Sequence, residues 1–251
     1  MKKDLSLEKF VEGLHQFRGA SAKGVPSMSS LVEQFLLYRQ ELLDWNRRFN
    51  LTAITDPGGV LIKHFFDSLS LLLVYDKPQT RLLDIGAGAG FPGLPLKIVR
   101  PDWHVTLLEA TGKKVAFLQH IIETFQLKDV EAVHARAEEL AHKSEYRAWF
   151  DVVTARAVAS LPVLLEYAAP FCRAGGKIIL FKKGVKQEEF AQGMNAAHQV
   201  GAILHAYVGI NLPGLEDDRW LIVWEQQKPC PAQFPRSGAA IAKRPLGEAA
   251  G

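Results

Sequence analysis

The spacing of apolar residues changes along the chain near residue 75. Before that point apolar residues recur at helical intervals: Leu7, Phe10, Val11 and Leu14 predict a short helix. A second, longer helix is expected to begin near Ser29 or Ser30, and residues 59–74 predict a third helical segment. From about residue 80, short apolar runs of strand length alternate with helical stretches. We therefore expect a helical N-terminal segment over residues 1–75 and a second domain over residues 76–226.

The second domain reads as an α/β fold. Its predicted strands cover 81–85, 104–109, 130–134, 150–154 and 178–182, followed by 202–208 and 219–225. The predicted helices between them include 113–125, 161–171 and 188–200, and residues 172–177 read as a turn. This alternation predicts a doubly wound, Rossmann-like sheet that is mostly parallel, with a C-terminal antiparallel hairpin. Residues 227–251, rich in Pro, Ala and Gly, predict a basic and poorly ordered tail.

A glycine-rich turn follows the first predicted strand and precedes a helical pattern. Gly86, Gly88 and Gly90 are spaced for a sharp turn that brings backbone close to a ligand. The dinucleotide fingerprint requires a glycine five residues after the first, where this chain has Phe91. Asp84 lies just before the turn and Glu109 ends the second strand, where a carboxylate can accept hydrogen bonds from a ribose. The combination favours S-adenosylmethionine; the alternative is a tight turn that binds nothing.

Composition limits the class of protein. The 251 residues contain no apolar run of membrane-spanning length, and the first residues lack the apolar core of a signal peptide. Cys172 and Cys230 are not spaced for a metal site, so we expect no metal, no membrane and a reducing, cytoplasmic setting. A net charge of +3 permits a nucleic-acid partner without requiring one.

Basic residues cluster where a ligand is expected. Lys113 and Lys114 follow the second strand, and Lys182 and Lys183 end the fifth, so both pairs are predicted at the ligand-binding edge of the sheet. There they could neutralise RNA phosphates, as could Arg47 and Arg48 in the helical segment. The alternative for each pair is solvated surface.

Four motifs together resemble one known family. They are Asn46-Arg47-Arg48-Phe49-Asn50-Leu51-Thr52-Ala53-Ile54, His64-Phe65-Phe66-Asp67-Ser68-Leu69, Asp84 to Gly93, and Thr154-Ala155-Arg156-Ala157. In this order they closely resemble the bacterial 16S rRNA guanine-N7 methyltransferases (RsmG, or glucose-inhibited division protein B), over about residues 30 to 225. The resemblance implies a class I methyltransferase fold. It also implies methyl transfer from S-adenosylmethionine to N7 of a guanine in the 530 loop of 16S rRNA, on the RNA or the small ribosomal subunit. Separately from the resemblance, we expect a monomer.

The resemblance also implies roles for individual residues. Gly86, Gly88, Phe91 and Glu109 would form the cofactor pocket. Ala137 and Glu138 would face the adenine, and Arg156 would close the site. The chain departs from the family pattern in its tail, where Gly238 is offset and Ile241 replaces a proline. The first 24 residues do not align with the family.

The residues near strand four limit the chemistry. Carbon-5 methylation of a pyrimidine needs a cysteine nucleophile, and neither Cys172 nor Cys230 lies after that strand. The Asp/Asn-Pro-Pro-aromatic loop that receives an exocyclic amine is replaced by a turn that contains Arg156. Guanine N7 carries a lone pair and needs positioning but no general base, so Arg156 is predicted to orient the reactants. The alternatives are methylation of another substrate and a non-catalytic cofactor-binding protein. For His64 and Asp67, helix packing and a place at the pocket mouth are both open.

Overall fold

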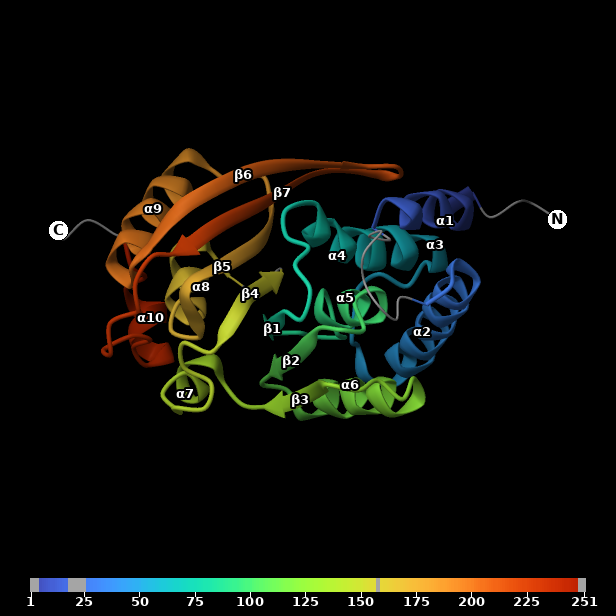
Figure 1. Cartoon of the computed structure of the whole chain (residues 1–251), viewed down its shortest axis with the longest axis horizontal. Coiled ribbons are helices and arrows are strands. Elements are labelled where there is room, and N and C mark those ends of the chain that lie inside the picture. The colour runs from blue at the N-terminus through green and yellow to red at the C-terminus, as the bar shows by residue number, and fades with distance from the viewer. Residues whose placement is uncertain (1–4, 18–25, 157–158, 248–251) are drawn as a thin grey trace. The chain divides into compact units, whose positions relative to one another are not determined.

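The computed structural model describes residues 5–17, 26–156 and 159–247 (Figure 1). Seven strands form one sheet in the order β3-β2-β1-β4-β5-β7-β6. Their bounds are β1 Arg81–Ile85, β2 His104–Glu109, β3 Val130–His134, β4 Phe150–Arg156, β5 Cys172–Lys183, β6 Ala202–Leu212 and β7 Leu215–Gln226. The pairs β1–β4, β2–β3 and β4–β5 are parallel, whereas β5–β7 is antiparallel. The predicted mixed, doubly wound sheet is confirmed.

The helices follow the predicted order with two additions. The long ones are α1 Leu5–Phe17, α2 Met28–Phe49, α6 Gly112–Thr124 and α9 Gln187–Val200, and the shorter ones include α5 Gly93–Val99 and α8 Leu161–Ala168. The helices α7 Ala137–Leu140 and α10 Gly238–Lys243 were not predicted, because four to six residues are too few to show a helical period. Within the described residues, no helix is long and apolar enough to cross a membrane.

The chain divides into two compact units. Unit 1 comprises residues 1–80, 87–134 and 211–217, and unit 2 comprises residues 81–86, 135–210 and 218–251. This division does not test the domain limits predicted at residues 75 and 226, which stay predictions.

Unit 1 has an aromatic core beneath its N-terminal helices. Phe10, Phe35, Phe65 and Phe66 are fully buried, and the Phe10 and Phe35 rings meet edge to face with centroids 5.2 Å apart. The predicted helical segment 59–74 forms as successive short pieces: α3 Pro57–Gly59, the π-helix η1 Val60–Phe66, α4 Asp67–Leu69 and the 3₁₀-helix η2 Ser70–Leu73. A π-type bond from the Asp67 N–H to the Ile62 carbonyl widens the turn.

Unit 2 contains an irregularity where the sequence predicted a turn. The pairing advances from Phe150 to Val152 on β4, whereas it advances from Cys172 to Lys177 on β5. Gly175 adopts a φ of 77°, so the chain loops out locally and stays within the strand. The prediction of a separate turn over 172–177 is therefore wrong, although the glycines do mark the irregular position.

The poorly ordered tail predicted for residues 227–251 is not found in its described part. Residues 227–247 include α10 and buried Ile241 and Leu246 (Figure 1, red end of the chain). Arg147 and Arg236 hold this tail through hydrogen bonds that amino-acid composition does not reveal.

Candidate functional site

The glycine turn after β1 has the backbone conformation that its sequence predicts. Gly86, Gly88 and Gly90 have φ values of 67°, 62° and 94°, a region that residues other than glycine rarely adopt. The Ala87 N–H donates to the Leu108 carbonyl (3.0 Å), which ties the turn to the end of β2. This backbone hydrogen bond therefore fixes the turn against the end of β2.

Glu109, at the end of β2, is bound to this turn. Its Oε2 accepts a hydrogen bond from the Gly88 N–H (3.0 Å), and its Oε1 accepts one from the Thr111 N–H (2.9 Å). Glu109 is 6% exposed, and the Lys114 ammonium lies 3.9 Å from Oε2. A carboxylate offers about four acceptor positions, so acceptor capacity remains for a ligand diol. The residues present thus fit the ribose of S-adenosylmethionine.

Tyr38 of α2 supports the far side of the turn and was not predicted as a site residue. Its hydroxyl donates to the Ala89 carbonyl (2.5 Å), and its ring is fully buried. A Cβ on Gly90 would lie 2.4 Å from both the Tyr38 hydroxyl and the Leu94 side chain, so only glycine fits there. The sequence carried one signal, a tyrosine on an apolar helix face, since a buried hydroxyl needs a partner.

Contacts link the motifs within unit 1. Phe91 is 5% exposed, and its ring stacks on His64 with centroids 4.5 Å apart and ring planes 12° apart. His64 Nε2 lies 2.7 Å from the Thr52 hydroxyl, and the Asn46 amide bonds both the N–H and the carbonyl of Thr52. Phe91 therefore packs in the interior, and a role for it in cofactor binding rests on its backbone. His64 is also buried, which favours packing over a place at a pocket mouth.

Unit 2 contains the predicted site residues of strands β1 and β4. Asp84 is fully buried on β1, opposite Thr154 of β4. Arg156 is half-buried and is the last residue of β4, opposite Phe181 of β5. The predicted strand 150–154 is thus two residues longer, and Arg156 ends the strand instead of following it.

Ala137 and Glu138, predicted to face the adenine, open the short helix α7, and both are half-buried. The Glu138 carboxylate lies against the tail: a Cβ on Gly238 would be 2.6 Å from its Oε1. Both residues belong to unit 2, as does the tail.

The predicted RNA-binding lysines differ in their surroundings. The Lys182 ammonium pairs with Glu189 (2.7 Å) and donates to the Ala159 carbonyl (3.2 Å), so most of its N–H donors are bonded within the protein. Lys113 and Lys183 are exposed. A structural role, as opposed to RNA binding, is therefore better supported for Lys182 than for the other lysines.

Comparison with known proteins identifies the family. The sequence model of the GidB family, described as rRNA small subunit methyltransferase G, matches residues 31–213. The chain belongs to this family. A relative named ribosomal RNA small subunit methyltransferase G, from Roseiflexus castenholzii, is 44% identical over 91% of this chain and 97% of its own length. One of the same name from Dehalococcoides mccartyi is 46% identical with the same coverage. A SAM-dependent methyltransferase structure from Aquifex aeolicus shares the fold (TM-score 0.53, 15% identity, 70% of this chain and 97% of that chain).

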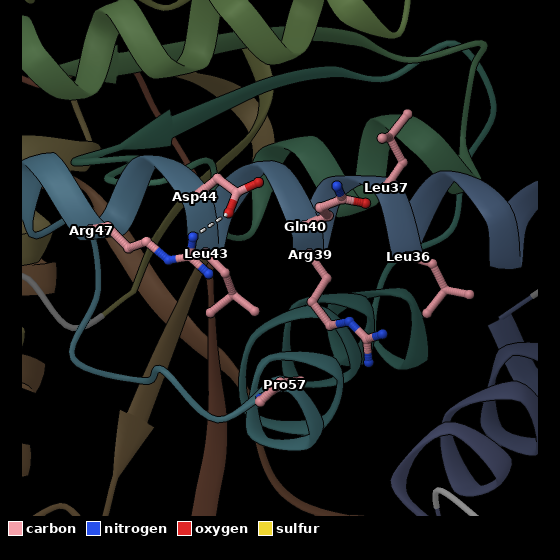
Figure 2. A pocket seen from close by; sticks show the side chains of 8 residues that line it. All are labelled: Leu36, Leu37, Arg39, Gln40, Leu43, Asp44, Arg47 and Pro57. Carbon is pink, nitrogen blue, oxygen red and sulfur yellow. Dashed lines mark ion pairs between the residues drawn. The ribbon is translucent and has the colours of Figure 1, made fainter.

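This member of the rRNA small subunit methyltransferase G family also has a groove on α2, of about 440 Å³ (Figure 2). Leu36, Leu43 and Pro57 form apolar walls, and Arg47 turns back to pair with Asp44 at 3.3 Å. That pair is solvent-exposed and so contributes little to stability. Arg47 can therefore exchange its carboxylate partner for another anion at small cost.

Proposed function

We propose that this protein transfers a methyl group from S-adenosylmethionine to N7 of a guanine in 16S rRNA. The observation that carries the proposal is the buried Glu109 carboxylate bonded to the Gly88 N–H, in a chain of the rRNA small subunit methyltransferase G family. The target is the naked RNA or the small ribosomal subunit, and the resemblance implies the 530 loop. The protein works in the cytoplasm as a monomer.

Each cofactor-binding residue has a proposed role. Gly86 and Gly88 present backbone to the cofactor, and Glu109 accepts hydrogen bonds from its ribose. Ala137 and Glu138 contact the adenine. Phe91 contributes through its backbone, and Asp84 suits the amino group of the methionine part. The bound cofactor supplies an electrophilic methyl group on a sulfonium.

The protein's contribution to the reaction is orientation. Guanine N7 already has its lone pair and loses no proton, so no side chain has to act as a base. The nucleophile must lie in line with the bond that breaks, and holding reactants in such geometry supplies much of an enzyme's acceleration. Arg156, at the carboxyl end of β4, suits this role because its planar fork can bond a carboxylate or guanine O6.

RNA binding is assigned to basic side chains that face solvent. Lys113, Lys183 and Arg48 are exposed, and Lys114 and Arg47 have partners at 3.9 Å and 3.3 Å that an RNA phosphate could replace. Lys182 is kept as a weaker candidate because its ion pair with Glu189 is more enclosed.

The experiment supplies labelled S-adenosylmethionine together with 16S rRNA, 30S subunits and 70S ribosomes, and maps the modified base. The proposal expects one 7-methylguanine in the small-subunit RNA. Label on another base or on protein would identify a different methyltransferase. Cofactor binding without transfer to any of the three substrates would favour a non-catalytic assembly protein.

A further inference from the structure

The described part of the C-terminal tail, residues 227–247, is fixed to α8 by an ion pair. Arg236 donates from Nε to Oε1 of Glu166 (2.8 Å) and from Nη2 to Oε2 (2.7 Å). The backbone N–H of Arg236 also donates to Oε1 (2.9 Å). Glu166 is fully buried, and a buried carboxylate is costly without its partner. This fork therefore holds the start of α10 in one place.

A second guanidinium ties the tail to the segment that follows α7. Arg147 lies in that segment and donates four hydrogen bonds of 2.9 to 3.1 Å to main-chain carbonyls. The accepting carbonyls are those of Ala141, Cys230, Pro231 and Phe234. Because one acceptor follows α7 and three belong to the tail, the two segments form one hydrogen-bonded block.

Within this block, Gly238 lies directly against Glu138. A Cβ at position 238 would be 2.6 Å from Oε1 of Glu138 and 3.9 Å from the Tyr167 hydroxyl. Burial raises the pKa of Tyr167, and the nearby charges of Glu138 and Glu166 raise it further. No hydrogen bond to the Glu138 carboxylate occurs among residues 5–17, 26–156 and 159–247, so its oxygens can accept one from a ligand.

We propose that Gly238 and the docked tail set the position of the Glu138 carboxylate and thereby the affinity for S-adenosylmethionine. The inference rests on the proposed function, in which Glu138 contacts the adenine. Gly238 touches no ligand and is a positioning residue. Because it has no side chain, the Glu138 carboxylate can occupy the space beside it. Arg236 and Arg147 keep the tail close enough for that to matter.

The test is Gly238→Ala in the full-length protein. The added methyl group meets only the flexible end of Glu138, and the position has no left-handed backbone, so the fold should tolerate it. Calorimetry with S-adenosylmethionine should give a Kd raised roughly tenfold, the cost of one displaced charged hydrogen bond. The melting temperature should stay as in the wild type.

Two comparisons make the result specific. Ser237→Ala removes the cap of α10, whose Oγ accepts from the Ala240 N–H (3.3 Å), but adds no atom beside Glu138, so the Kd should not change. In a Glu138→Ala background, Gly238→Ala should cause no further loss, because the displaced carboxylate is already gone.

The inference alone is overturned if Gly238→Ala binds as the wild type does, if it weakens binding equally in both backgrounds, or if it unfolds the protein. If the wild-type protein itself binds no S-adenosylmethionine, the proposed function fails, and the inference fails with it.

Discussion

The part of the glycine turn that lies in unit 1, from Ala87 onward, and the C-terminal tail in unit 2 are held in different ways. Besides the Glu109 carboxylate, which accepts from the Gly88 N–H, the turn is supported by uncharged groups: the Tyr38 hydroxyl bonds the Ala89 carbonyl, and Phe91 stacks on His64. The tail is held by guanidinium groups, with Arg236 on the buried Glu166 carboxylate and Arg147 on main-chain carbonyls. Packing around Gly90 limits the first region to glycine there, whereas the second depends on hydrogen bonds from two arginines. The two should therefore fail under different perturbations.

The largest effect is expected in the tail. Arg236→Ala leaves Glu166 buried without its partner, and breaking such a pair should lower the free energy of unfolding by about 3 kcal/mol or more. Arg244→Ala is the matched control, since its side chain is exposed and only its carbonyl accepts from Arg236. Urea unfolding measures both. Equal midpoints for the two variants would mean that the fork does not hold the tail.

Arg156 should affect turnover more than stability. Arg156→Ala should lower methyl transfer to small-subunit RNA on the order of a hundredfold, as misplacement of reactants does. Arg156→Lys should also be damaging, because the charge remains but the planar fork is lost. Single-turnover rates measure both variants. A normal rate for Arg156→Ala, or loss of its folded state, would return Arg156 to a structural role.

The glycine turn should respond to shape. Gly90→Ala places a methyl group 2.4 Å from the Tyr38 hydroxyl and Leu94, at a φ of 94°. We expect a loss of about 2 kcal/mol in the free energy of unfolding. Gly112→Ala is the control, because its Cβ would meet His134 at an ordinary 3.5 Å. If the two variants unfold at the same urea concentration, Tyr38 and Leu94 do not enclose Gly90 tightly.

A smaller effect is expected from pH at Asp151 of β4, which lies outside both regions. Burial alone would raise the pKa of Asp151 in unit 2, but hydrogen bonds from Arg81 and Arg173 lower it to about 2, from an ordinary value of 3.8. The folded state has the lower pKa, so this carboxylate stabilises the fold above about pH 4. That contribution is lost as the pH falls toward 2. Asp151→Asn should flatten the fall in stability over this range, as measured by urea midpoints. An unaltered slope would contradict the assignment.

The sequence predicted the strands of the parallel part and the glycine turn, because both depend on local signals. Apolar runs mark buried strands, and Gly86, Gly88 and Gly90 are required by their positive φ values. The roles of Tyr38 and Asn46 could not be predicted, because each depends on a partner far along the chain or on the shape of a helix end. Tyr38, for example, bonds a residue 51 positions away.

The tail shows a second limit of sequence reasoning. Its Pro, Ala and Gly content indicates disorder, yet Arg236 finds Glu166 70 residues earlier. Composition reports how much apolar surface a segment can bury, and it is silent on individual ion pairs. The same reason explains why the sequence does not reveal the ion pair between Lys182 and Glu189.

We infer that the glycine turn and Glu109 hold the cofactor. The direct test is calorimetric titration of Glu109→Gln with S-adenosylmethionine, with Glu131→Gln on β3 as the control. Glutamine can still accept from the Gly88 N–H, but it loses the charge and one of the two acceptor oxygens. This placement of the cofactor predicts a Kd raised roughly tenfold or more for Glu109→Gln and unchanged for Glu131→Gln. Wild-type affinity in a folded Glu109→Gln protein would contradict it.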